Sequence, residues 1–252
     1  AGVSITDSTD FDLQALTLSG NLVVVSGGSI TDSGALNIAG AATIDAGSNA
    51  VTLNDGNTFS GNLTLTSAAL ELGATTVGGA LSVTASGAVT DSGALAITGT
   101  SSFTTSTSND DITLDTATNA FTGAVALNTT GSSGHAEVDG GTTKLDIAAS
   151  SVGGNLTLTG GNVLGITNDS GIVTVGGDLT ATTDANSGVI NMLNLAVDGS
   201  ISLVTNGTGD ATVKNDDGLE FATTTIGGDL TATATTGNIT DTGTLTITGV
   251  TN

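Results

Sequence analysis

Short runs of alternating apolar and polar residues follow one another along the whole chain. In one of them Leu63 and Leu65 alternate with Thr64 and Thr66, and similar runs return from one end of the sequence to the other. Alternation with a period of two residues, with β-branched residues at the polar positions, predicts β-strands. No segment shows the spacing and end signals of an amphipathic helix. The pattern therefore predicts an all-β protein.

The runs are grouped into a repeat that glycine punctuates. The stretch 229–249 holds three short runs separated by Gly or by Asp-Thr-Gly, and closely similar text stands at 80–99 and 21–40. A three-strand unit of about 20 residues cannot bury its apolar face alone, and it must stack on copies of itself. Eleven glycine-terminated units can be marked: 1–20, 21–40, 41–61, 62–79, 80–99, 100–123, 124–154, 155–177, 178–199, 200–228 and 229–249.

This layout predicts a parallel β-solenoid of about eleven three-stranded coils of roughly 20–31 residues, forming one continuous domain over 1–252. Each strand is expected to pair in parallel with its equivalent one coil on, at about 4.8 Å. The pair Gly78-Gly79 and its equivalents are expected at corners that need a positive φ. Phe59, Phe121 and Phe221 fall in third runs and are expected to point into the core.

The chain is strongly acidic. It has 24 Asp and Glu residues against Lys144 and Lys214, and a net charge of −22. No basic patch can form to neutralise phosphates, which argues against nucleic-acid binding and against electrostatic attraction to an anionic membrane. No apolar run approaches the roughly 18 residues of a membrane span. We therefore expect neither a nucleic-acid partner nor membrane insertion.

Catalysis has few side chains to use. His135 is the only His, and Cys, Trp, Tyr and Arg are absent. Enzymes that act on sugars need paired carboxylates, and aromatic platforms are missing here, so we expect no enzyme and no cofactor. His135 and both lysines fall in long units whose segments 131–138 and 206–213 resemble each other. These segments are either longer corners or a contact surface for a partner.

Four aspartates share one sequence slot, Ile/Val-Thr-Asp-Ser/Thr, and are candidate metal ligands: Asp7, Asp32, Asp91 and Asp241. Asp169 stands in a similar slot. Asp7 and Asp32 belong to adjacent predicted coils, so their carboxylates are expected about 5 Å apart. A cation such as Ca²⁺ would relieve the repulsion between them. The alternative is that each Asp accepts hydrogen bonds from its own turn.

The runs Gly-Gly-Asn/Asp-Leu-Thr, Ile-Thr-Asp-Ser/Thr-Gly and Leu-Thr-Ile-Thr-Gly resemble the β-strand repeats of filamentous-haemagglutinin-like adhesins and related bacterial surface exoproteins. The similarity covers essentially the whole chain. It implies a right-handed parallel β-helix that is exported and displayed at the cell surface. The secretion domains of that family are missing, so the resemblance implies a segment of a giant protein or a secreted subunit.

Three functions remain open. The favoured one is a structural subunit or stalk segment of an extracellular filament or cell-surface layer. The second is an adhesin segment of a large secreted protein, with an unknown receptor or glycan. The third is an ice-binding solenoid, because Thr-x-Thr pairs begin at Thr64, Thr157, Thr180 and Thr231. Thr on an exposed strand face is, however, already explained by β-propensity.

The two ends of the chain lack the features of capped solenoid termini, so the expected partner is another copy, head to tail, or a tandem neighbouring repeat. Residues 1–7 match 86–91, a second run, and 250–252 begin a first run. Placed tail to head, the two fragments would make one nearly complete coil with continuous sheets. The residues expected at this junction are Ala1, Gly2, Val3, Ile5, Leu245, Ile247, Val250 and Asn252.

Overall fold

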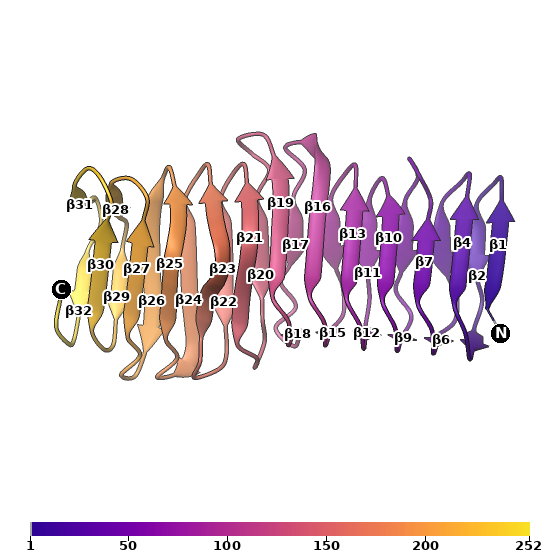
Figure 1. Ribbon diagram of the computed structural model, residues 1–252, viewed down its shortest axis with the longest axis horizontal. Helices are drawn as coiled ribbons and strands as arrows, with labels where there is room; N and C mark the ends of the chain where they lie inside the picture. Colours follow the sequence, from indigo (N-terminus) through magenta and orange to yellow (C-terminus); the bar gives the residue numbers. More distant parts are fainter. Residues whose placement is uncertain (1) are drawn as a thin grey trace.

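The computed structural model is a rod of parallel strands wound into twelve turns, with the two termini at opposite ends (Figure 1). The structure describes residues 2–252, and at residues 169, 170 and 186 it describes the backbone alone. The expected all-β, right-handed parallel β-helix with three-stranded coils is confirmed. Within the described residues, no helix is long and apolar enough to cross a membrane.

Three sheets run along the rod, and we name them A, B and C. Sheet A holds one strand from each turn, in the order β1 (Val3–Asp7), β4 (Leu22–Ser26), β7 (Ala42–Asp45), β10 (Leu63–Ser67), β13 (Leu81–Ala85), β16 (Ser101–Ser108), β19 (Val125–Thr130), β21 (Leu145–Val152), β23 (Ile166–Val175), β25 (Ile190–Val197), β27 (Ala211–Asn215) and β30 (Leu230–Ala234). Sheet B follows the order β2 (Phe11–Leu13), β5 (Ile30–Asp32), β8 (Val51–Leu53), β11 (Leu70–Leu72), β14 (Val89–Asp91), β17 (Ile112–Leu114), β20 (Ala136–Asp139), β22 (Leu156–Gly160), β24 (Leu179–Asn186), β26 (Ser200–Asn206), β28 (Leu219–Phe221) and β31 (Ile239–Asp241). Sheet C holds β3 (Leu16–Leu18), β6 (Leu36–Ile38), β9 (Asn57–Phe59), β12 (Thr75–Val77), β15 (Leu95–Ile97) and β18 (Ala120–Phe121), while β29 (Thr224–Ile226) and β32 (Leu245–Ile247) join sheet B through the far end of β26.

Alternation along each strand places small aliphatic side chains inside the rod and Thr, Ser and Asp outside. Burying one Leu, Val or Ile side chain stabilises the fold by about 1.5–3 kcal/mol, and these residues, with a few Ala, Phe and Met, form one continuous core. Phe59, Phe121 and Phe221 are fully buried, as expected. Phe221, however, lies in sheet B rather than on the third side.

The turns of the structure differ less in length than the units marked in the sequence. One turn takes from 18 residues, between Leu63 and Leu81, to 24, between Ser101 and Val125. The marked unit 124–154 contains two strands of sheet A, β19 and β21, so the eleven expected coils are twelve turns. The runs at 155–159 and 178–182 open marked units, as those at 62–66 and 80–84 do, but they lie in sheet B and the other two lie in sheet A. An alternating run fits the inward face of any sheet, so the pattern alone does not identify the sheet.

The middle of the rod departs from the three-sided pattern. Sheet C ends at β18, and in the described residues the third side returns only at β29. Between them, β21 and β23 to β26 are seven to ten residues long, against three to five for most other strands. The central turns are therefore built from two long, bent strands, where the first turns have three short ones.

Candidate functional site

One row of corners carries a continuous series of hydrogen bonds, which we name the corner ladder: Asp111, His135, Asn155, Asp178 and Ser200. The Oδ1 atom of Asp111 accepts from the His135 N–H at 2.7 Å, and His135 Nδ1 accepts from the Asn155 N–H at 2.8 Å. Asn155 Oδ1 accepts from Asp178 N–H at 2.9 Å, and Asp178 Oδ1 accepts from Ser200 N–H at 2.8 Å. Backbone groups need such partners wherever the sheet ladder is interrupted. The ladder links five successive turns.

Other corners follow the same rule. In each case a side-chain oxygen accepts the backbone N–H of the corner residue one turn later, at 2.7–3.0 Å. The acceptor and donor residues are Asp10 and Ser29, Asn21 and Ala41, Asn62 and Ala80, Asp210 and Asp229, and Asp229 and Val250. The Asn or Asp of the Gly-Gly-Asn/Asp-Leu-Thr run is therefore a link between turns, a role that the sequence pattern did not reveal.

The corner glycines make room for this ladder. A Cβ on Gly154 would lie 2.6 Å from His135 Nδ1, and one on Gly177 or Gly79 would overlap the Oδ1 atom of Asn155 or Asn62. The glycine pairs do lie at corners, but the expected reason was wrong, because positive φ occurs at other glycines. These positions require glycine because the preceding turn approaches their backbone closely.

The four candidate metal ligands do not form a stack. Asp7 ends β1 in sheet A opposite Ser26, whereas Asp32 ends β5 in sheet B opposite Leu13, so the expected contact between Asp7 and Asp32 is wrong. Asp91 and Asp241 also end strands of sheet B, but in turns far from each other and from Asp32. Asp169 lies outside the described side chains.

Asp7 accepts hydrogen bonds from Thr9 N and Oγ1, both at 2.7 Å. The Thr9 side-chain and backbone hydrogen bonds hold its pKa below the ordinary value. Asp32 binds the next turn instead, because its Oδ1 atom accepts from Asn54 N–H at 2.8 Å. The contacts of Asp7 agree with the alternative, in which each Asp accepts hydrogen bonds from its own turn, whereas those of Asp32 do not.

Two inward asparagines clamp neighbouring turns to these aspartates. Asn57 donates to Asp32 Oδ2 at 2.7 Å, and its Oδ1 atom accepts from Leu36 N–H at 2.9 Å. Asn119 likewise donates to Asp91 Oδ2 at 2.7 Å. Both asparagines are almost fully buried. The sequence signal for them is an Asn at an inward position of an otherwise apolar alternation.

Burial raises the pKa of Asp91, although the Asn119 hydrogen bond works in the opposite direction. Its other oxygen, Oδ1, is buried and has no partner among the described residues. Burial also raises the pKa of Asp139, and the charges of Asp184 and Asp115 add to the increase. In the part of the chain that the structure describes, no three acidic, His or Cys side chains are placed to hold a metal ion. Calcium binding stays a prediction.

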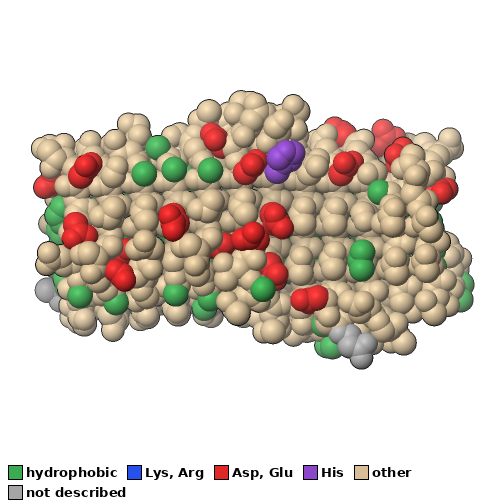
Figure 2. Space-filling view, turned by 180° about the vertical axis from the view of Figure 1, so that it is seen from behind, with side chains coloured by type: hydrophobic (Ala, Val, Ile, Leu, Met, Phe, Trp, Pro, Cys, Tyr) green, Lys and Arg blue, Asp and Glu red, His purple; other side chains and the backbone are tan. Residues whose placement is uncertain are grey.

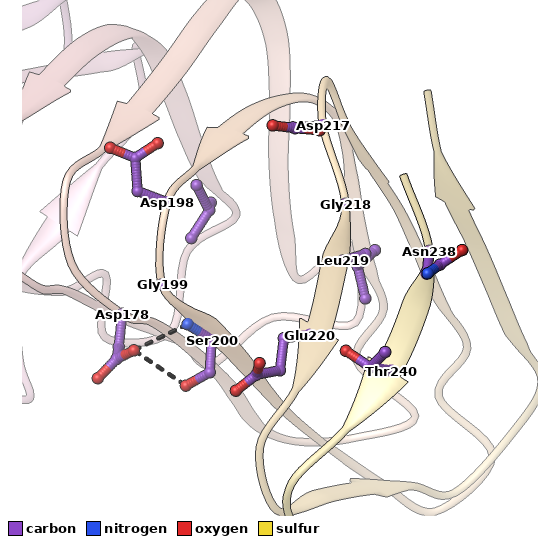
Figure 3. Close-up of a pocket in the computed structure, with 11 residues that line it drawn as sticks. Asp178, Asp198, Gly199, Ser200, Asp217, Gly218, Leu219, Glu220, Asn238 and Thr240 are labelled. Carbon is purple, nitrogen blue, oxygen red and sulfur yellow. Dashed lines mark hydrogen bonds between the residues drawn. The ribbon is translucent and has the colours of Figure 1, made fainter. Parts of the chain in front are cut away.

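A depression of about 530 Å³ opens beside the corner ladder and is lined by Asp178, Asp198, Asp217 and Glu220 among others. Asp178 Oδ1 also accepts from the Ser200 hydroxyl at 2.9 Å (Figure 3). Figure 3 shows the carboxylates arranged around the depression, pointing in different directions. They share no common centre at which a ligand could be held by all of them.

The outer face of sheet B is polar and regular (Figure 2). The outward residues at the centres of its strands stack in register as Asp12, Thr31, Thr52, Glu71, Thr90, Thr113, Glu137, Thr157, Thr180 and Ser202. The carboxylates of Asp12, Glu71 and Glu137 therefore stand three turns apart, at about 14 Å, which exceeds the screening length of about 8–10 Å at moderate salt. This spacing limits repulsion along the column.

The Thr-x-Thr pairs lie on two faces. The pairs beginning at Thr64 and Thr231 belong to sheet A, and those beginning at Thr157 and Thr180 stack on each other in sheet B. The four pairs therefore do not form one array. Ice binding stays a prediction without a single surface to support it.

The two similar segments, 131–138 and 206–213, form corners between strands. Gly131 and Gly207 have positive φ values of 82° and 63°. The hydroxyl groups of Thr129 and Thr205 close the corners by donating to the carbonyls of Gly134 and Gly209, both at 2.6 Å. The first corner joins sheet A to sheet B and the second leads into sheet A. The interpretation of these segments as longer corners therefore explains both of them.

The expected junction residues lie on the first and last turns. Val3, Ile5, Leu245 and Ile247 are partly buried against the core, and Val250 is 59% exposed. Gly2 and Asn252 are exposed, and Ala1 lies outside the described residues.

One premise of that junction is wrong. Residues 3–7 pair with β4 in sheet A and are not a second run, while Thr251 bridges Leu230 in the same sheet. The two fragments therefore cannot complete one coil in the way the sequence match suggested. A continuation of the rod has to pair along sheet A directly.

Comparison with known families gives one match. A family model described as repeats of unknown function (DUF5649) matches residues 1–66, 60–128 and 208–252. The matched parts hold the three-sided turns, and residues 129–207 hold the long-stranded turns. No curated protein and no solved structure is significantly similar to the chain. A β-repeat protein is confirmed, and the similarity to filamentous-haemagglutinin-like adhesins stays a prediction.

Proposed function

The chain belongs to the DUF5649 family of repeats, and we propose that it is a structural subunit or stalk segment of an extracellular filament or cell-surface layer. The main support is the unbroken parallel pairing of sheet A through all twelve turns, from β1 to β30. At about 4.8 Å per turn this makes a rod about 50 Å long. In such a solenoid each turn contacts only its neighbours, so length is added without changing the cross-section. A rod of this kind holds apart whatever is attached at its two ends.

The surface suits that role outside a cell. The central outward column of sheet B consists of Thr, Ser, Asp and Glu, and the net charge of −22 keeps rods soluble and apart. Only two lysines and no arginine stand in the chain, so proteases that cleave after basic residues find few sites. These features support an extracellular or bacterial cell-surface location as part of the same proposal.

The last turn presents an interior that a further turn would cover. An apolar hollow of about 240 Å³ is lined by Phe221, Leu230, Ala232, Ile239 and Leu245 among others. Ile239 is 50% exposed. Covering such surface contributes about 25 cal/mol for each Å² of apolar area. The next turn can come from the same polypeptide, as a tandem repeat, or from another copy, end to end.

Electron microscopy of the native material, together with the mass of the denatured chain, tests this proposal. Long rods built from a subunit of 252 residues support end-to-end assembly, and rods within one very large chain support a tandem stalk. If the chain polymerises, Ile239→Asp should shorten the rods, while Val23→Asp, on the outer face near the other end, should not. Native material without rods or fibres overturns the proposal.

A further inference from the structure

One link of the corner ladder differs in chemistry from the others. Asp111, Asn155 and Asp178 accept through side-chain oxygens, whereas His135 accepts through its ring nitrogen Nδ1. Amide and ionised carboxylate oxygens accept hydrogen bonds throughout the range from about pH 5 to about pH 8. An imidazole nitrogen accepts only while the ring is neutral, and imidazole changes its charge within that range. The link from the Asn155 N–H to His135 is therefore the one in this ladder that a proton can remove.

The position of the donor decides which nitrogen carries the proton of the neutral ring. Nδ1 accepts from the Asn155 N–H at 2.8 Å, so the proton lies on Nε2. Nδ1 occupies the place that Asn155 Oδ1 takes one turn later, and in both corners a glycine, Gly154 or Gly177, leaves room for the acceptor. A second proton can bind only at Nδ1. It would set an N–H donor of the ring against the N–H donor of Asn155, and the link would be lost.

The similar segment 206–213 shows how the same corner closes without a histidine. Asp210 stands at the place of His135, and its Oδ1 atom accepts from the Asp229 N–H at 2.8 Å. A Cβ on Gly228 would overlap that oxygen, so a glycine makes room for the acceptor in this corner too. An oxygen acceptor is therefore sufficient to close the corner. What the histidine adds is a response to protons.

The protonated ring has acceptors close to its own corner. A groove of about 300 Å³ on the outer side of sheet B is lined by Asp111, Thr113, His135, Glu137 and Asn155 among others. Among the described residues, the charged side chains that line it are those of Asp111 and Glu137. Glu137 is exposed and follows His135 by two residues, which places both side chains on one side of the strand. A ring with two N–H donors can turn from the Asn155 N–H toward these carboxylates.

Backbone hydrogen bonds on both sides confine the change to one link. The Gly154 N–H donates to the Gly134 carbonyl at 2.8 Å, and the Ala136 N–H donates to the Asn155 carbonyl at 2.9 Å. Neither bond involves a group that takes up protons in this range. The two turns therefore stay paired when the side-chain link is lost.

We propose that the contact of His135 with the Asn155 N–H is a pH-sensitive link, closed while the ring is neutral and open once Nδ1 is protonated. Opening takes one proton from solvent, which forms the new N–H bond of the ring. The Asn155 N–H then faces water, and the ring turns toward Asp111 and Glu137. Acidification thus interrupts the corner ladder between the turns of β20 and β22.

The link is a feature of this chain rather than of the shared repeat. His135 and Asn155 both lie in the segment 129–207, which the family model leaves unmatched. The link goes beyond the proposed stalk function and does not depend on it, because it is set by the contacts of one corner.

Amide hydrogen exchange of the isotope-labelled 252-residue chain, followed by NMR at about pH 7.5 and about pH 5.5, tests the link. Protection factors are compared, because they remove the intrinsic pH dependence of exchange. We expect the protection of the Asn155 amide to fall about fivefold or more, the equivalent of one hydrogen bond. The matched control is the Asp229 amide, which donates to the Asp210 oxygen and should keep its protection. The nitrogen shifts of the His135 ring should show the Nε2–H form at the higher pH.

His135→Asn supplies an oxygen acceptor at the same corner, so the Asn155 amide should stay protected at both pH values. The proposal is overturned if that variant loses protection as the parent chain does, if the parent keeps it although the ring becomes protonated, or if the ring stays neutral throughout. The Gly154 and Ala136 amides should remain protected, and their loss would contradict a change confined to one link. The readout is a single amide, so its failure is distinct from a failure to find rods, which tests the proposed function.

Discussion

At the scale of single residues, the corner ladder explains why Gly and Asn or Asp so often stand side by side. The Oδ1 atom of Asn155 receives the N–H of Asp178, and Gly177, just before Asp178, leaves room for that oxygen. The two halves of the motif work across turns: the glycine of one turn serves the asparagine of the turn before. Each copy of the run therefore depends on the previous copy.

Gly177→Ala tests this dependence. The added Cβ would lie 2.9 Å from the Gly154 carbonyl carbon and would overlap Asn155 Oδ1, so we expect a loss of about 1–3 kcal/mol in the free energy of unfolding. Gly56→Ala is the matched control, because nothing lies within 4 Å of a Cβ at Gly56. Urea unfolding measures both. Equal effects of the two substitutions would contradict the close-approach explanation.

The only histidine gives a second test of the ladder. His135→Ala removes the acceptor of the Asn155 N–H and should lower stability by about 1 kcal/mol. His135→Asn supplies an amide oxygen, as Asn155 and Asn62 do at their corners, and should restore most of the loss. Thermal unfolding distinguishes them. A His135→Asn variant as unstable as His135→Ala would show that the ring contributes by packing instead.

Alternation predicted the inward residues well, because one property, burial, decides their type. Phe59 and Leu63 are buried as expected. The ladder was missed because its partners, such as His135 and Asn155, stand about one turn apart and leave no local signal. The Asp7–Asp32 contact was predicted wrongly, since the same four-residue text ends strands of two different sheets.

At the scale of elements, the strands were predictable and their sheet membership was not. The run at Leu156 copies the text of the run at Leu63, yet the first lies in sheet B and the second in sheet A. Both sheets need the same inward apolar face. The run at Leu156 follows β21, a strand of sheet A, across one corner, whereas the run at Leu63 follows β9, a strand of sheet C.

Two phenylalanines from neighbouring strands meet in the core. Phe103 of β16 and Phe121 of β18 pack edge to face, with ring centroids 6.5 Å apart and both side chains fully buried. Phe103→Ala should therefore lower the free energy of unfolding by about 3–5 kcal/mol. Phe11→Ala makes the same truncation at a half-buried site of the first turn and should cost less. Denaturant titration compares the two; a larger loss at Phe11 would be inconsistent with this packing.

At the scale of the whole molecule, acidification should first stabilise the rod. The pKa values of Asp91 and Asp139 are raised by burial, so the folded chain binds protons at pH values where the unfolded chain has already released them. Their contribution is fully present below the ordinary Asp value of about 3.9 and is lost as pH rises through the raised values. We expect the melting temperature to rise from pH 7 toward about pH 4.

The double variant Asp91→Asn/Asp139→Asn should flatten this rise, and any rise that remains comes from relief of the general negative charge. Asp7→Asn is the control: the pKa of Asp7 is lowered by Thr9, so its contribution is present above the ordinary value and is lost only as pH falls through the lowered one. A melting temperature that falls between pH 7 and pH 5 in the parent chain would count against buried carboxyls as the cause.

The corner ladder also has a direction. Asp111 precedes His135, and Asn155 precedes Asp178, so at these outer corners the acceptor always belongs to the earlier turn. A chain that emerges with its N-terminus first meets a waiting acceptor at each new corner. The loop closed at each step is only about one turn long, so its entropic cost stays small and constant. Folding can therefore proceed vectorially behind the emerging chain, with each completed turn acting as the template for the next.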